Sequence, residues 1–177
     1  LAGIDGSIRI GESDRIEVQL MKSYSEYPEY IQSDYDQKAQ LNDFAYLLDY
    51  EHDDNRWLWS ARYAEFGDDF RADMGFINRV DFEELDISGG PTWRFGPGSR
   101  FSEIHIRGGW EKIRDEAGSD FGEEVSLGIH ARGPMQSFML LFYNQGEKYY
   151  NGQFFDEDIF SFFGIITPWA GVEIGID

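Results

Sequence analysis

The chain contains no cysteine, few basic residues and no long apolar run. Without cysteine there can be no disulfide, thiolate metal site or C-x-x-C-H haem attachment. Its 34 acidic and 15 basic residues give a net charge of −19. Such a chain lacks the basic surface that neutralises phosphates, so we expect no nucleic-acid partner. No stretch approaches the roughly 18 consecutive apolar residues of a transmembrane helix, so a membrane-spanning structure would have to be a β-barrel.

The 177 residues fit a single domain, 1–177. The beginning of the chain has no basic segment followed by an apolar one and no initiator methionine, so Leu1 is interpreted as a mature or cut end.

Aromatic residues make up 17% of the chain and recur within an alternation of apolar and polar residues. This period of two is typical of strands with one apolar face. It predicts nine strands, over residues 4–10, 16–21, 43–51, 57–63, 84–95, 103–111, 125–132, 138–143 and 159–176. Pro91 and Pro168 each remove a ladder hydrogen bond, which predicts a bulge or bend at both. The best helix candidate, residues 33–41, is short and lies in a loop.

Short and long connections alternate between these strands. The short ones, residues 11–14, 53–55, 96–99 and 133–135, are rich in residues that favour hairpin turns. The long, acidic ones are residues 25–40, 65–79, 112–122 and 146–157. Outer-membrane barrels have this asymmetry of short periplasmic turns and longer extracellular loops. The sequence therefore predicts an all-β, antiparallel up-and-down transmembrane β-barrel. Because bacterial barrels have even strand numbers, nine strands favour a segment of a larger barrel.

The alternation divides the candidate functional residues between two faces. We predict that the polar face lines a lumen, with the residues Asp5, Arg9, Glu17, Asp49, Arg62, Glu103, His105, Arg107, His130 and Arg132. The aromatic residues predicted at the lipid interface are Trp57, Trp59, Tyr63, Trp93 and Trp110. The polar set could instead form a proton relay or metal site, but His105 and His130 have no evident third ligand except the distant His52. The aromatic residues could instead be platforms that stack on sugars.

One stretch carries a family resemblance. Residues 67–81 read GDDFRADMGFINRVD, and they follow Trp57-Leu58-Trp59-Ser60. Both segments resemble sequences in a family of bacterial surface proteins of uncharacterised function. Those proteins resemble a carbohydrate-binding family-9-like N-terminal domain followed by a long barrel region. The resemblance implies an outer-membrane barrel and supplies no catalytic residues, and the N-terminal domain is not among these 177 residues.

The function expected from the sequence is passive: a pore, or a surface scaffold, in a bacterial outer membrane. Neither a nucleophile elbow nor a phosphate-binding glycine loop is present, so the sequence favours a role without catalysis or a cofactor. The acidic clusters near the loops could bind Ca²⁺ but match no EF-hand spacing. The expected partners are outer-membrane lipid, the rest of a larger barrel or another subunit, and glycans. Two alternatives are a soluble all-β carbohydrate-binding module and a part of a polysaccharide-processing surface protein.

Overall fold

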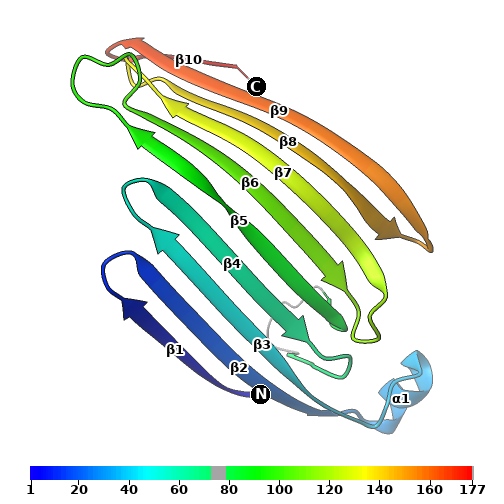
Figure 1. Ribbon diagram of the computed structural model, residues 1–177. Helices are drawn as coiled ribbons and strands as arrows, with labels where there is room; N and C mark the ends of the chain where they lie inside the picture. The colour runs from blue at the N-terminus through cyan, green and yellow to red at the C-terminus, as the bar shows by residue number, and fades with distance from the viewer. Residues whose placement is uncertain (73–78, 177) are drawn as a thin grey trace.

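The computed structural model describes residues 1–72 and 79–176, which form ten strands and one short helix (Figure 1). The all-β, antiparallel up-and-down arrangement predicted from the sequence is confirmed. The elements are β1 (Ala2–Ile10), β2 (Asp14–Glu26), α1 (Glu29–Tyr35), β3 (Gln40–Asp53), β4 (Trp57–Phe66), β5 (Phe82–Arg94), β6 (Glu103–Arg114), β7 (Asp120–Arg132), β8 (Phe138–Tyr150), β9 (Gln153–Trp169) and β10 (Val172–Ile176).

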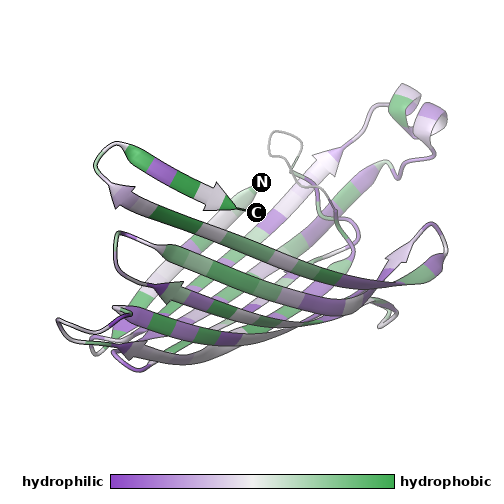
Figure 2. Ribbon diagram, turned by 90° about the horizontal axis from the view of Figure 1, so that it is seen from above, coloured by the Kyte–Doolittle hydropathy of each residue, from purple (hydrophilic) through white to green (hydrophobic). Residues whose placement is uncertain are grey.

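Each strand pairs with the next one in the sequence, and the described residues form one sheet in the order β1 to β10. Seen from above, the sheet is curved into an open trough (Figure 2). In the described part of the chain, β1 and β10 do not pair with each other, so the sheet has two free edges. The prediction of nine strands was wrong because the last predicted strand is a hairpin. The chain turns at residues 170–171, where Gly171 has a φ of 83°.

The connections lie at two ends of the sheet, which we call the turn end and the loop end (Figure 1). The four predicted short connections are confirmed, and the turn at residues 170–171 is a fifth at the turn end. At the loop end, only residues 27–39 and 67–81 form long connections. The other two are short because the strands continue into them: five residues join β6 to β7, and Asn151 and Gly152, both with positive φ, join β8 to β9. The helix α1 precedes the predicted segment 33–41 and overlaps only its start.

The two prolines act differently. Near Pro168 the register of β9 and β10 shifts, as expected from a bulge. At Pro91 the ladder to β6 is interrupted between Gly89 and Thr92, but the register is the same on both sides, so the predicted bulge is not found there. Among the described residues, no helix is long and apolar enough to cross a membrane.

Candidate functional site on the charged face

The strand register sorts the side chains onto two faces of the sheet. All ten residues predicted to line a lumen occupy one of them, which we call the charged face. The five predicted interface aromatic residues occupy the opposite, apolar face. Small residues of the charged face such as Ala45 and Ser88 are buried, whereas large side chains of the apolar face are exposed. The charged face is therefore the concave side of the trough.

Towards the loop end, the charged face is acidic. One row of paired residues crosses seven strands and carries five carboxylates and a single cation, in the order Ser7, Glu17, Asp49, Arg62, Asp86, Glu111 and Glu124. The Arg62 Nε donates to the Asp49 carboxylate at 2.7 Å. Arg15 similarly pairs with Glu17, and Lys148 with Glu157 at 2.6 Å. These cations are neutralised by acidic neighbours, across strands for Arg62 and Lys148 and along β2 for Arg15.

Towards the turn end, Arg107 has a different environment. Its Nη2 donates to the hydroxyls of Ser60, at 3.1 Å, and Ser88, and these two hydroxyls lie 2.8 Å apart. Within the described residues no carboxylate lies within ion-pair distance of this guanidinium. A guanidinium has five N–H donors. The Nε–H and both Nη1–H groups of Arg107 therefore have no bonded acceptor in the part of the chain that the structure describes.

The row next to Arg107, on its turn-end side, contains three polar residues with unfilled hydrogen-bonding capacity. Thr92, His105 and His130 pair across β5, β6 and β7. Thr92 is only 4% exposed. Its Oγ1 and the Nε2 atoms of both histidines are shielded from solvent and have no hydrogen-bond partner among the described residues. Buried polar groups of this kind are rare in folded proteins, because each one loses its bonds to water without replacement.

Glycines surround Arg107 on its own face. Gly128 is its partner in β7, Gly109 is two residues along β6, and Gly90 lies against it from β5. A Cβ on Gly90 would lie 1.9 Å from the Ile106 carbonyl oxygen, and one on Gly109 would lie 2.4 Å from Ser126 Oγ. These strands thus approach too closely for larger side chains, which is a common reason for glycine inside a strand. We call this site, formed by Arg107, its two serines and the three glycines, the cup.

A pocket of about 300 Å³ opens beside this cup. Its lining on the charged face is Arg107, His105 and the two serines, and on the other side of the pocket Leu58 with Glu51 and Asp53 at the end of β3. The pocket thus combines one guanidinium and two hydroxyls with two carboxylates, which is a combination suited to a small polar solute.

The charged face becomes apolar on β8 and β9. Phe138, Leu140 and Phe142 continue the rows of Arg132, His130 and Gly128. Their neighbours in β9 are Ile165, Phe163 and Ser161. The concave side therefore has an acidic, a basic and an apolar region.

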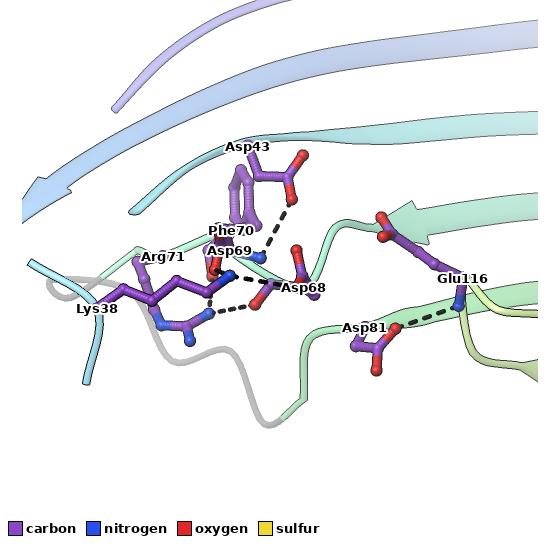
Figure 3. Close-up of polar contacts among 8 residues, drawn as sticks. All are labelled: Lys38, Asp43, Asp68, Asp69, Phe70, Arg71, Asp81 and Glu116. Atoms are coloured by element: carbon purple, nitrogen blue, oxygen red, sulfur yellow. Dashed lines mark hydrogen bonds and ion pairs between the residues drawn. The ribbon is translucent and has the colours of Figure 1, made fainter. Parts of the chain in front are cut away.

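At the loop end, residues 67–72, which follow β4, fold onto the charged face (Figure 3). Phe70 is completely buried and meets Phe66 edge-on, with ring centroids 5.6 Å apart. The backbone N–H of Arg71 donates to Ser23 Oγ at 2.9 Å, and that of Asp69 donates to an Asp43 carboxylate oxygen at 3.1 Å. Residues 67–72 thus form a clamp over β2 and β3.

Gly67 is required at the start of this clamp. A Cβ at Gly67 would lie 2.2 Å from the Asp43 carboxylate, so only glycine fits without displacing it. Lys38, from the other long connection, donates to Asp69 at 2.6 Å and lies 3.6 Å from Asp68. The hydrogen bond to Asp69 raises the pKa of Lys38 above its ordinary value, and the charge of Asp68 adds to this effect.

The β6–β7 turn joins the same assembly, because the N–H of Glu116 donates to Asp81 at 3.2 Å. Desolvation raises the pKa of Glu116, and the carboxylates of Asp43, Asp68 and Asp81 raise it further. In the part of the chain that the structure describes, no group of three or more potential ligands has a geometry that would hold a metal ion. These four acidic residues give the loop end of the charged face a negative charge.

The sequence-based interpretation missed the serines that hold Arg107 and the glycines around it. The glycine pairs 89–90 and 108–109, inside otherwise regular strands, are the signal that could have revealed this close approach.

The chain matches no known protein family, and comparisons with curated proteins and with solved structures find no significant match. The resemblance of residues 67–81 to a surface-protein family thus stays a prediction, and residues 73–78 of that stretch lie outside the described residues.

Proposed function

We propose that this chain forms the wall of an outer-membrane β-barrel, alone or with further strands, and acts as a pore or a surface scaffold. The observation that carries this proposal is the exposed apolar face. A globular monomer of 20.5 kDa would expose roughly 8,800 Å², whereas this chain exposes 12417 Å², an excess of about 3,600 Å². Only Leu41, Ala45, Ala64, Phe70 and Ala131 are buried apolar residues in the described part. Lipid contacting the apolar face accounts for this inverted distribution.

Hydrogen bonds at the margins of the apolar face also support a membrane position. Tyr63 donates to Glu65 at 2.6 Å, and the indole of Trp110 donates to Glu123 at 2.8 Å. Tyr143 donates to Asp158 in the same way, again towards the loop end. At the turn end, Tyr50 donates to Asp14 at 2.8 Å. Aromatic residues whose polar atoms point away from an apolar band are typical of the interfacial girdles of membrane barrels.

The apolar band has a suitable height. On β5 and just beyond it, the apolar-face positions 85–95 include no charged residue, whereas Glu83 precedes them on the same face. Eleven residues rise about 33 Å along a strand, which corresponds to a height of about 25 Å at the tilt of about 40° common in outer-membrane barrels. At the loop-end margin of the band Leu85 pairs with Lys112, and the apolar face is polar in the rest of this row, with Lys112, Glu123, Glu147 and Asp156.

The free edges determine which partners fit the proposal. Unpaired strand edges do not occur in contact with lipid, because their N–H and C=O groups would lack partners. Ten strands satisfy the even-number rule, so β1 and β10 could close on each other or on further strands of a larger barrel or second subunit.

Tryptophan fluorescence in vesicles of brominated lipid tests the proposal. In a background with all five tryptophans replaced by phenylalanine, a single tryptophan is introduced at Val18 or at Gln19. These neighbours in β2 are both exposed but lie on opposite faces. We expect strong quenching for Val18→Trp and weak quenching for Gln19→Trp. Equal, weak quenching at both positions in folded protein would contradict a membrane position.

A second candidate is a soluble sugar-binding module, which is favoured by one observation. The rings of Trp57 and Trp59 are parallel within 13°, have centroids 5.8 Å apart, and are exposed by 43% and 45%. Such a flat apolar surface would suit a pyranose ring. This candidate predicts a detergent-free monomer whose saturable glycan binding is lost in Trp59→Ala.

A further inference from the structure

We propose that the cup around Arg107 binds an oxyanion, meaning a carboxylate or phosphate group, either free or carried by a small solute. This inference concerns the charged face itself and goes beyond a passive wall. It holds whether that face lines a pore or a groove.

The first argument is the unbalanced charge of Arg107. In a chain of net charge −19, two other arginines of this face are paired with acids, Arg62 with Asp49 and Arg94 with Glu103. Arg107 instead contacts two neutral hydroxyls. The eight positions that flank it on this face carry no carboxylate: Ser88, Gly90, Thr92, His105, Gly109, Ser126, Gly128 and His130.

The second argument is the direction in which Arg107 is held. Both serines bond to Nη2, so the side chain is fixed from the loop-end side while Nε and Nη1 keep their donors. The free Nε–H and Nη1–H groups point in different directions, and each can donate a charge-assisted hydrogen bond to an oxyanion oxygen.

The third argument comes from the adjacent row. Thr92 Oγ1 and the Nε2 atoms of His105 and His130 lack hydrogen-bond partners in the described part of the chain. Thr92 is almost completely buried. An oxyanion above Arg107 would give these groups an acceptor after small side-chain rotations. The pocket of about 300 Å³ next to the cup is lined by the carboxylates Glu51 and Asp53, so it could hold the uncharged remainder of the solute, whose hydroxyl groups would donate to them.

Direct binding tests the proposal on the full chain, folded in detergent micelles or, if it proves soluble, in buffer. The side-chain Nε–H signals of the arginines are followed by NMR during titration with inorganic phosphate, acetate or glucuronate, at constant ionic strength kept with sodium chloride. We expect saturable shifts of the Arg107 signal and of the ring signals of His105 and His130. The Arg62 signal should not move, because Arg62 is already paired with Asp49.

Two variants set the expected magnitude. Arg107→Gln should abolish the saturable histidine shifts. Arg107→Lys should weaken binding about tenfold, because the single lysine nitrogen cannot bond to the two serines and also supply the donors of Nε and Nη1. The matched control Arg62→Gln should bind as the unmodified chain does. Tighter binding of glucuronate than of acetate would assign the site to an acidic solute, and equal or weaker binding to the free ion. Linear shifts that are equal at Arg62 and Arg107, or histidine shifts that persist in Arg107→Gln, would overturn the proposal.

Discussion

Replacing Phe70 with alanine tests whether residues 67–72 are held on the charged face by this one side chain. Phe70 is fully buried, and its ring contacts Phe66, which stacks on Phe82 with centroids 5.1 Å apart. Loss of a buried phenylalanine costs about 3 to 5 kcal/mol, which combines lost burial with the cavity that remains. The clamp's other attachments are the hydrogen bonds to Ser23 and Asp43, of about 1 kcal/mol each. Phe70 should therefore supply most of the attachment.

Amide hydrogen exchange measures this attachment directly, because the Arg71 N–H is bonded to Ser23 within the clamp. A free-energy loss of about 3 kcal/mol corresponds to a roughly 100-fold faster exchange, since about 1.4 kcal/mol is a factor of ten. Asp43→Ala removes the acceptor of the Asp69 N–H but leaves that of the Arg71 N–H, and it should accelerate exchange at Arg71 only about fivefold, by the loss of one hydrogen bond. Phe95→Ala, at a side chain that is 43% exposed, is the matched control and should leave the Arg71 amide unchanged.

Unchanged exchange at Arg71 in folded Phe70→Ala protein would refute this reasoning. It would mean that the clamp is held by Lys38 and the backbone hydrogen bonds instead.

Three further predictions follow from other parts of the structure. The double variant Arg107→Gln, Arg132→Gln should shift the selectivity of a reconstituted pore towards cations, because the acidic row from Glu17 to Glu124 would then dominate the charged face. Unchanged reversal potentials in bilayer recordings would count against a lumen there. Gly89→Ala should lower the free energy of unfolding by about 1 to 3 kcal/mol, since its Cβ would lie 2.3 Å from the Trp59 ring. The control Gly6→Ala, whose Cβ meets nothing within 4 Å, should cost much less in the same denaturant titration. In the turn after β3, the N–H groups of Arg56 and Trp57 donate to the Asp54 carboxylate and lower its pKa. The ionised Asp54 therefore stabilises the fold at pH values above its pKa in the unfolded chain, and this stabilisation is lost as the pH falls through its pKa in the folded chain. The difference in denaturation midpoint between the unmodified chain and Asp54→Ala should shrink on acidification, and a pH-independent difference would contradict this assignment.

Much of the sheet could be predicted because β1 to β7 have a clear period of two, with polar turn residues between them. The prediction failed at β8 to β10, where both faces are apolar over long stretches and the period carries little information. Phe138 and Met139 lie on opposite faces, and only Gly171 indicates the final turn. The acidic residues 156–158 suggested a loop, but they belong to β9 where it extends beyond the apolar band.

The sequence predicts which face of the sheet the site residues occupy, but not which residues they contact. Alternation places Arg107 and the histidines on one side of the sheet, whichever strands are neighbours. The contacts of Arg107 with Ser60 and Ser88 depend on the register of β4, β5 and β6, which turn lengths do not fix with certainty. The clamp was also beyond prediction, because Phe70 is a single aromatic residue in an acidic loop. The neighbouring Arg71 N–H donates to Ser23, 48 positions earlier in the chain, so the attachment is a long-range contact.

The short last strand has a practical consequence for labelling the protein. β1 begins near the loop end of the sheet (Figure 1). β10 begins at the turn end and has only five residues, so Ile176 pairs with Gly164, far from the loop end of β9. A fluorophore at Ala2 would therefore report on the loop end of the sheet, and one at Ile176 on its turn-end half. The two labels would thus report on two different depths along the strands.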